Sequence, residues 1–324
     1  MNVIEVKELK KVYKDKPAVN EISFDVAEGE IFGFLGPNGA GKSTSINILA
    51  TILPPTSGDA TVNGFSIIED RDSVRKSIGL VFQDPSLDDR LTASENLRFH
   101  AKLYGVPKNL FTDRMKEVLE LVDLWDRKDD FVRTFSGGMR RRLEIARGLL
   151  HYPKILFLDE PTIGLDPQTR AHLWEYVLRL KREKMMTIFM TTHYMDEAEA
   201  CDRIAIIDHG DIVALDTPEA LKKEVGGDII TLKGDKLSDL KIELEHRYGL
   251  KVDNSDGSLR IEVENGETFL PKLFNELDVS ISSVELRKPT LDDVFLSITG
   301  RNIRAETMSG KDRTQEHMRR RGRH

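Results

Sequence analysis

Apolar and charged residues alternate along the first part of the chain, with the two-residue period of strands that bury one face. This alternation, and the compact apolar runs after it, predict strands at residues 3–12, 22–26, 30–35, 60–62 and 77–83. Residues 43–53 instead have helical spacing, and Pro54 and Pro55 end that helix because proline cannot continue it. A glycine-rich segment therefore joins a buried strand to a helix.

Residues 92–150 differ in pattern, because apolar residues recur there at the three- and four-residue spacing of helices. Helices are predicted at 92–104, 110–122 and 138–150. Apolar runs at 154–158 and 187–191 then flank a predicted helix at 168–184, a pattern typical of buried parallel strands with a crossover helix. A last hairpin is expected over 203–215. This part of the chain predicts an α/β fold.

After Thr217 and Pro218, a good helix start, the pattern changes again. Helices are predicted at 219–224, 236–248, 267–277 and 290–300, and strands at 228–233, on either side of 253–257, and at 280–286. This mixture predicts a small second domain of the α+β class. We expect domains at 1–217 and 218–300, with a helical subdomain at about 84–150 of the first and a tail at 301–324.

The second domain contains no visible catalytic constellation. Asp292 and Asp293 are adjacent carboxylates, and we interpret them as the exposed start of the last helix. A regulatory or dimer-stabilising role is the hypothesis for this domain.

Charge is distributed unevenly along the 324 residues. The net charge is -7, which argues against wholesale binding of nucleic acid. The tail, residues 301–324, has eight Lys or Arg against three acidic residues, and its composition predicts a disordered, solvated segment. A contact of this basic tail with anionic lipid headgroups is the alternative interpretation.

Two features bear on the compartment. The chain has one cysteine, Cys201, so it forms no internal disulfide, as in proteins of a reducing compartment. It shows no signal-peptide pattern and no run near the roughly 20 apolar residues that a spanning helix needs. We expect a cytoplasmic protein, peripheral on the cytoplasmic face of the cell membrane if it works there, with another chain crossing the bilayer.

The glycine-rich segment reads GPNGAGKST and has the form of a phosphate-binding loop, the Walker A motif. Its glycines allow backbone N–H groups to surround phosphate oxygens, and the helix that follows adds positive potential. Lys42 is placed to bridge the β- and γ-phosphates, the Ser43 hydroxyl to bind Mg²⁺, and Thr44 to bind a phosphate oxygen. The candidate nucleotide-binding residues here are Gly36, Pro37, Asn38, Gly39, Ala40, Gly41, Lys42, Ser43 and Thr44.

Two acidic residues end the apolar run ILFL. Carboxylates at a strand end often only face solvent, but an adjacent pair followed by Pro161 is less ordinary. Asp159 is a candidate ligand of Mg²⁺, and Glu160 is a candidate base for the water that attacks phosphate. Positioning that water and neutralising charge are the main tasks in phosphoryl transfer.

A second anion site is predicted at Ser136, Gly137 and Gly138, which precede a helix and offer it an N-terminal cap. Alone, such a turn would be interpreted as a simple helix cap. In order and spacing with the other two motifs, it indicates nucleotide binding.

Residues 1 to about 216 resemble the nucleotide-binding subunits of ATP-binding cassette (ABC) transporters, through these three motifs, GLDP at 164–167 and His193 in MTTHYMDEAE. The resemblance implies a P-loop NTPase cassette, with a RecA-like core, a helical subdomain and here the small C-terminal α+β domain. It implies that Gln83 contacts magnesium, that Asp166 organises a dimer, and that His193 contacts the γ-phosphate and the attacking water. Tyr13 matches the aromatic residue that stacks on adenine.

One motif departs from the commonest family signature, LSGGQ, because this chain has FSGGM, followed by Arg140, Arg141 and Arg142. The variant is similar to the drug-exporter group of daunorubicin/doxorubicin resistance ATPases, as are the stretch at 84–107 and the closing PTLDDVFLSITGR. We interpret Arg141 and Arg142 as the solvated face of a helix.

The resemblance implies an ATPase that closes as a dimer around two ATP molecules, as a homodimer or with a similar ATPase subunit. It implies a separate integral membrane permease as partner, and export as the direction of transport. The alternative is a soluble nucleotide-gated factor of the same superfamily, not coupled to a transporter. Such factors generally have paired cassettes, coiled coils or zinc modules, whereas this chain shows one cassette and no cysteine cluster.

Overall fold

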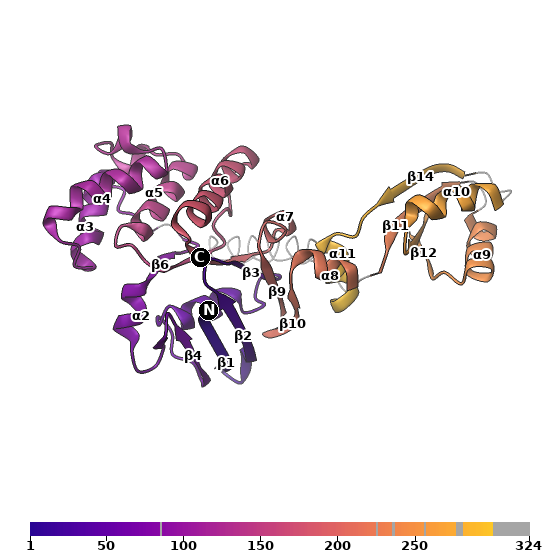
Figure 1. The fold of residues 1–324 in the computed structure, drawn as a ribbon, viewed down its shortest axis with the longest axis horizontal. Helices are drawn as coiled ribbons and strands as arrows, with labels where there is room; N and C mark the ends of the chain where they lie inside the picture. Colours follow the sequence, from indigo (N-terminus) through magenta and orange to yellow (C-terminus); the bar gives the residue numbers. More distant parts are fainter. Residues whose placement is uncertain (85, 225, 235–236, 256, 277–280, 301–324) are drawn as a thin grey trace, which may run out of the picture. The chain divides into compact units, whose positions relative to one another are not determined.

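The protein forms two compact units that divide between Leu215 and Asp216 (Figure 1). A computed structural model describes residues 1–300 except 85, 225, 235–236, 256 and 277–280. The predicted disorder of the tail at 301–324 lies outside the described residues. The predicted extents of the domains remain predictions, although the division falls close to residue 217.

A six-stranded sheet in the order β10-β9-β3-β8-β7-β6 forms the centre of the first unit. Its strands are β3 (Ile31–Leu35), β6 (Ile78–Val81), β7 (Ile155–Asp159), β8 (Thr187–Thr192), β9 (Arg203–Asp208) and β10 (Asp211–Asp216). The pairings among β6, β7, β8, β3 and β9 are parallel, and every residue of β3, β7 and β8 is buried. The carboxyl ends of β3 and β7 therefore open on one edge of the sheet.

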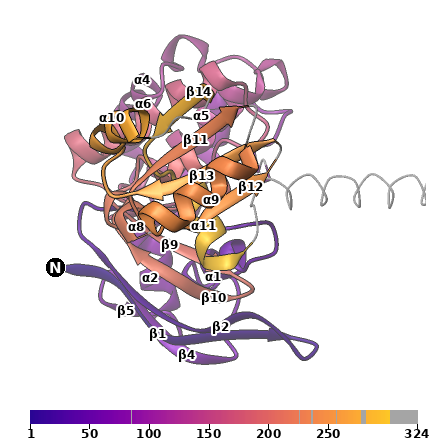
Figure 2. The ribbon, with the colours of Figure 1, turned by 90° about the vertical axis from the view of Figure 1, so that its right-hand side faces the viewer.

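A second, antiparallel sheet has the order β2-β1-β4-β5, and Figure 2 shows β1, β2 and β4 beside one another. Its strands are β1 (Asn2–Tyr13), β2 (Lys16–Ala27), β4 (Ser57–Val62) and β5 (Phe65–Ser66). Helix α1 (Lys42–Leu49) and both sheets contribute to one apolar core. This core contains the packed rings of Phe24, Phe32, Phe34, Phe157 and Phe189.

Helices complete the first unit: α2 (Arg71–Ser77), α3 (Ala93–Leu103), α4 (Lys108–Leu121), α5 (Gly137–Leu149), α6 (Pro167–Lys184) and the short α7 (Met195–Ala198). Helices α3, α4 and α5 lie together in Figure 1, as the spacing of apolar residues at 92–150 predicts. A capping box of Thr92 and Glu95 begins α3. Among the described helices, none has both the length and the apolar character that a membrane crossing needs.

The second unit is built on a sheet in the order β12-β13-β11-β14, in which all pairings are antiparallel. Its strands are β11 (Asp228–Gly234), β12 (Val252–Ser255), β13 (Ser258–Val263) and β14 (Ile281–Arg287), and its helices are α8 (Pro218–Glu224), α9 (Leu237–Tyr248), α10 (Gly266–Glu276) and α11 (Leu291–Thr299). It has its own apolar core, which includes Ile230, Leu244 and Leu273.

The predicted fold class is confirmed, with differences in detail. Residue Ser77 ends α2 and does not begin a strand, since its hydroxyl donates to the carbonyl of Val74 (2.8 Å). Helix α2 escapes prediction because Val74 is its only apolar residue. The interpretation of Asp293 as exposed is wrong: the side chain is buried, where it caps α11 and accepts hydrogen bonds from two arginines.

Cys201 follows α7 and lies against β3 of the central sheet, with 6% of its surface exposed. A Cβ added to Gly33 of β3 would lie 2.8 Å from its Sγ atom, so the thiol fills the space that this glycine leaves. Burial raises the pKa of the thiol well above its ordinary value.

Candidate active site

The glycine-rich loop connects β3 to α1 at the carboxyl edge of the central sheet. Gly41 has a φ of 111°, and a Cβ there would lie 2.3 Å from the carbonyl oxygen of Ala18. A Cβ at Gly36 would lie 2.2 Å from the carbonyl oxygen of Ile207. Both positions therefore require glycine, and the loop packs closely on β2 and β9.

A cavity of about 370 Å³ opens at this loop and brings several predicted residues together. Its lining consists of Ala18, Asn38, Gly39, Gly41, Lys42, Ser43, Thr44, Gln83 and Glu160. Gln83 comes from the segment after β6 and is exposed, and Glu160 comes from the end of β7. Four separate segments of the chain thus meet in one cavity.

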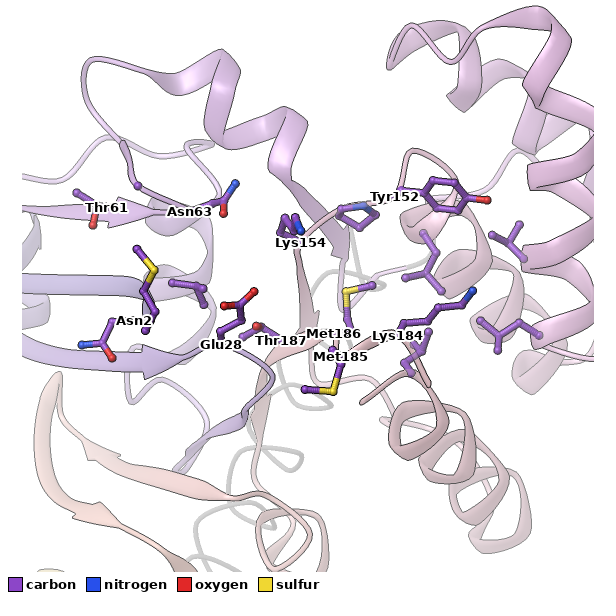
Figure 3. Close-up of a pocket in the computed structure, with 18 of the residues that line it drawn as sticks. Asn2, Glu28, Thr61, Asn63, Tyr152, Lys154, Lys184, Met185, Met186 and Thr187 are labelled. Carbon is purple, nitrogen blue, oxygen red and sulfur yellow. The ribbon is translucent and has the colours of Figure 1, made fainter. Parts of the chain in front are cut away.

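A larger cavity, of about 840 Å³, lies elsewhere in the same unit (Figure 3). Thr187, which begins β8, and Lys154, which precedes β7, line it, so it opens at the amino edge of these strands. None of the predicted site residues lines this cavity. Size alone therefore does not locate the active site.

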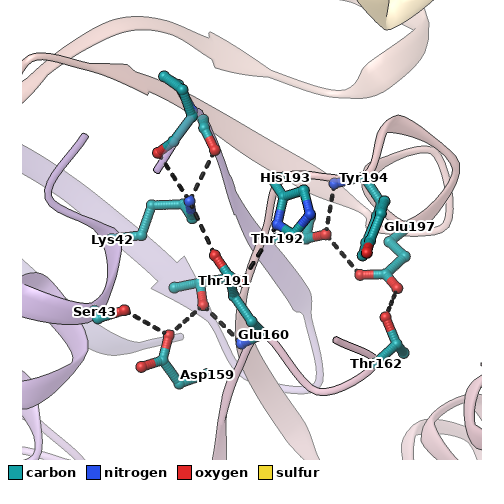
Figure 4. A network of polar contacts seen from close by, with 12 residues as sticks. Lys42, Ser43, Asp159, Glu160, Thr162, Thr191, Thr192, His193, Tyr194 and Glu197 are labelled. Atoms are coloured by element: carbon teal, nitrogen blue, oxygen red, sulfur yellow. Dashed lines mark hydrogen bonds and ion pairs between the residues drawn. The ribbon is translucent and has the colours of Figure 1, made fainter. Parts of the chain in front are cut away.

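Lys42 is the first residue of α1 and is buried. Its ammonium group donates to the carbonyl oxygens of Gly36 (2.8 Å) and Pro37 (3.0 Å) and lies 3.2 Å from Oε1 of Glu160 (Figure 4). Burial lowers the pKa of Lys42, and the Glu160 carboxylate opposes that shift. The ammonium group is thus directed at the loop and at the neighbouring acid.

Glu160 lies between two groups. Its Oε1 faces Lys42, and its Oε2 lies 3.2 Å from Nδ1 of His193, close enough for an ion pair but without the alignment of a hydrogen bond. Burial raises the pKa of Glu160, but His193 and Lys42 outweigh burial, so the pKa lies below its ordinary value. Glu160 is therefore an ionised carboxylate at neutral pH. Its φ of 44° is unusual for a residue with a side chain.

Asp159 accepts hydrogen bonds from the hydroxyls of Ser43 (3.0 Å) and Thr191 (2.6 Å), while Thr191 accepts one from the backbone N–H of Glu160 (3.0 Å). Burial raises the pKa of Asp159 despite these bonds. Ser43, Asp159 and Gln83 together offer hydroxyl, carboxylate and amide oxygens, which are the ligands Mg²⁺ prefers. In the part of the chain that the structure describes, no group of three His, Cys, Asp or Glu could by itself hold a metal ion.

Ser136 caps α5, where its hydroxyl accepts from the backbone N–H of Met139 (3.3 Å), and Ser136 and Gly137 are exposed. Gly138 packs on α6, because a Cβ there would lie 2.3 Å from Cγ2 of Thr169. Asp166 caps α6 and accepts from the same Thr169 (2.6 and 3.0 Å). The structure thus brings the Ser136–Gly138 turn close to Asp166, but neither lines the cavity of the phosphate loop.

Tyr13 ends β1 and is 47% exposed. The Nζ atom of Lys11 lies 5.5 Å from the centre of its ring, and Tyr13 does not line the cavity either. His193 does not line the cavity but lies beside Glu160, which does. The centre of its ring lies 4.0 Å from that of Tyr194.

Sequence analysis missed several residues that hold the site together. Thr191 is one of them, and Glu197 of α7, which is buried, is another. Glu197 accepts hydrogen bonds from the hydroxyls of Thr162, two residues after Glu160, and of Thr192, directly before His193 (2.6 Å for Thr192). In the sequence, Thr191 is marked by the pair of threonines before His193, and Glu197 by one of the acidic residues shortly after it. Both signals are too common to be specific.

The interpretation of Arg141 and Arg142 as a solvated helix face is wrong. Arg141 is 7% exposed and donates to the backbone carbonyls of Phe82, just after β6, and of Asp159, at the end of β7. Arg142 is partly buried and donates to the carbonyl of Val122 (3.1 Å) and the hydroxyl of Tyr176 (3.3 Å). Helical spacing alone does not separate such arginines from solvated ones.

A phosphate loop between a buried parallel strand and a helix, facing an Asp–Glu pair at the end of another strand, defines a P-loop nucleoside triphosphatase. A family model described as "ABC transporter" matches residues 19–163, and one described as "ATP-binding protein DrrA1-3-like, C-terminal domain" matches residues 217–299. The chain belongs to the ATP-binding proteins of ABC transporters, and it is an ATPase.

Individual relatives match over most of the chain. The linearmycin resistance ATP-binding protein LnrL of Bacillus subtilis (strain 168) is 40% identical, over 93% of this chain and 100% of its own length. The daunorubicin/doxorubicin resistance ATP-binding protein DrrA of Streptomyces peucetius is 37% identical, over 92% of each chain. The dimeric ATP-binding cassette MJ0796, solved in a post-hydrolysis state with ADP and phosphate, is 28% identical with a TM-score of 0.61, over 66% of this chain and 98% of its own.

Proposed function

We propose that the cavity at the phosphate loop binds the phosphates of ATP and that Glu160 is the base of the hydrolysis reaction. What supports this is the position of the Glu160 carboxylate, buried and ionised between Lys42 and His193. A γ-phosphate in the cavity would draw the Lys42 ammonium away from Glu160. The freed carboxylate would then accept a proton from water that His193 helps to position.

We further propose that Mg²⁺ accompanies the nucleotide. Ser43, Asp159 and Gln83 would hold the ion, with nucleotide oxygens completing its coordination, and when bound it would neutralise charge on the phosphates. The remaining roles follow the motif positions. Gly36–Thr44 cradle phosphate, Thr44 binds an oxygen, and Tyr13 stacks on adenine.

The second half of the site comes, in this proposal, from a second copy of the chain. The Ser136–Gly138 turn is exposed and lies outside the loop cavity, so it is available to cover a nucleotide held by a partner, with Asp166 nearby at the interface. Shifting such a dimer from 1:99 open to 99:1 closed requires about 5.5 kcal/mol of differential affinity. Charge-assisted contacts to two γ-phosphates are of the kind that supply such an energy.

The cycle is proposed to drive export through a separate integral membrane permease, with this chain peripheral on the cytoplasmic face of the cell membrane. The resistance proteins LnrL and DrrA, similar over more than nine-tenths of this chain, support a role in removing toxic compounds.

For the tail at 301–324, a contact with anionic lipid remains the alternative to a solvated segment. Binding of the protein to vesicles with and without anionic lipid would distinguish the two.

The test is Glu160→Gln, which keeps the shape of the side chain and removes its basicity. The variant should bind ATP, hydrolyse it at least about 100-fold more slowly, and accumulate as a dimer in size-exclusion chromatography with Mg²⁺ and ATP. Glu175→Gln, at an exposed carboxylate of α6, is the matched control and should behave like the native protein. Near-native turnover in Glu160→Gln would exclude Glu160 as the base.

A further inference from the structure

Helix α5 presents three charged residues on one face, at the three-residue spacing that places side chains on the same side of a helix. These residues are Arg141, which contacts Phe82 directly before Gln83, and Glu144 and Arg147, which both contact Ser86 after it. Arg141 is 7% exposed and Glu144 is 1% exposed, so two charged side chains of the same helix are buried here.

Arg141 joins the two strands that carry site residues. Its Nη1 donates to the carbonyl oxygen of Phe82, immediately before Gln83. Its Nε donates to the carbonyl of Pro161 (2.7 Å), and its Nη2 to those of Asp159 (3.1 Å) and Glu160 (3.3 Å). One guanidinium group therefore fixes the backbone before Gln83 relative to the backbone of Glu160.

Glu144 and Arg147 both bind Ser86, on the other side of Gln83. The Oε1 atom of Glu144 accepts from the backbone N–H of Ser86 (2.7 Å) and from its hydroxyl (3.3 Å), and its Oε2 pairs with Nη1 of Arg141 (3.0 Å). Arg147 donates to the carbonyl (2.9 Å) and the hydroxyl (2.6 Å) of Ser86. The backbone is thus held on both sides of Gln83 by one helix.

Stability alone is a weak explanation for this arrangement. Burying two charged side chains costs desolvation energy, and their mutual attraction often does no more than offset that cost. Well-packed apolar residues would stabilise a core at least as well. Here the charged groups bond to backbone atoms on both sides of Gln83, which itself lies in the nucleotide cavity. The helix that holds them begins at the Ser136–Gly138 turn.

We propose that Arg141, Glu144 and Arg147 form a clamp, the α5 clamp, that positions Gln83 in the nucleotide cavity. The clamp residues do not touch nucleotide and act through Gln83. The proposal rests on the proposed role of Gln83 in the nucleotide site.

The experiment is a double-mutant cycle on ATP turnover by the full chain, between Arg147→Gln and Gln83→Ala. Arg147 is chosen because its loss leaves the buried pair of Arg141 and Glu144 intact. Arg142→Gln is the matched control, an arginine of the same helix that bonds outside the clamp. Ser86→Ala, a mild change at an exposed residue, removes the hydroxyl partner of Arg147 and provides a second variant should Arg147→Gln fold poorly.

The clamp predicts non-additivity. When Gln83 is present, Arg147→Gln should lower turnover by about tenfold, and Ser86→Ala should lower it more weakly. When residue 83 is alanine, each change should lower turnover by less than about twofold. Arg142→Gln should have the same effect in both backgrounds. Equal losses from Arg147→Gln with and without Gln83 would overturn the clamp, as would native turnover in Gln83→Ala.

The Mg²⁺ requirement of turnover, measured on Gln83→Ala, tests the proposed function separately. An unchanged requirement would remove Gln83 from the magnesium site. The turnover cycle would still decide whether the clamp acts through Gln83.

Discussion

Glu160 owes its position to neighbours from separate parts of the chain. Lys42 and His193 face its carboxylate, Arg141 binds its carbonyl, and the hydroxyl of Thr191 accepts from its N–H group. Its backbone, at a φ of 44°, adopts a conformation that costs energy and that persists only because the surrounding contacts hold it. Thr191 is central because the same hydroxyl also donates to Asp159.

Replacing Thr191 with valine, which has nearly the same shape, should destabilise the first unit by about 1–3 kcal/mol, because the buried N–H of Glu160 would lose its partner. ATP turnover should fall as well, since Asp159 and Glu160 both lose their hydrogen bond to the Thr191 hydroxyl. Urea unfolding and steady-state ATPase rates measure the two effects. Thr191→Ser keeps the hydroxyl and should restore most of both, and an undiminished stability in Thr191→Val would contradict this account.

At the scale of elements, hydrophobic periodicity predicted most of what is observed. Strands β3, β7 and β8 are short apolar runs, and α3 to α5 follow helical spacing, so each could be recognised locally. Helix α2 could not be recognised in this way, because it has a single apolar residue and therefore no apolar face with helical spacing.

The candidate site was predictable to a similar extent, and for a related reason. Motif positions predicted the loop, Gln83 and Glu160, which the structure brings into one cavity. The bond of Thr191 to Asp159 and the contacts of Arg141 with distant carbonyls were not predictable, because they depend on which strands become neighbours. Residue spacing within one helix contains no information about partners on another element.

Helix α11 gives a prediction for the second unit. Asp293 caps the helix at Thr290 (2.9 Å) and accepts from Arg260 (2.7 Å) and from both Nη atoms of Arg287. Burial raises the pKa of Asp293, but the bonds from Arg287 and Thr290 outweigh it, and the pKa lies below the ordinary 3.8. The ionised carboxylate therefore contributes stability that is present above about pH 3.8 and is lost as the pH falls further.

Asp293→Asn should lower the stability of the second unit by about 2 kcal/mol at pH 7 because two arginines lose a charged partner. It should also flatten the acid dependence of stability below pH 4. Calorimetric unfolding over a pH series tests both. Asp253→Asn, at an exposed position of β12, is the control, and identical curves for the two variants would refute the role assigned to Asp293.

At the scale of the whole molecule, the described residues include one apolar core between the sheets of the first unit and another within the second unit. Both tryptophans of the chain, Trp125 and Trp174, belong to the first unit. Tryptophan fluorescence therefore reports on the ATP-binding unit alone, whereas circular dichroism reports on both.

Truncation to residues 1–217 should leave a folded, ATP-binding unit whose fluorescence transition in urea matches that of the full chain, because its core lies within those residues. We expect dimerisation with ATP to weaken in the truncated Glu160→Gln protein, as the hypothesis of a dimer-stabilising second unit requires. Sedimentation velocity of the full-length and truncated variants measures it. Equal dimer fractions would refute that hypothesis.

The position of Cys201 has a practical consequence. Its thiol is buried and its pKa is raised, so little of it exists as the reactive thiolate at neutral pH. No other cysteine occurs in the chain. A cysteine introduced on the surface, for example at the exposed position of Glu175, would therefore be the main site of reaction with a maleimide dye or spin label. Distances between two copies could then be followed through the ATP cycle without first removing the natural thiol.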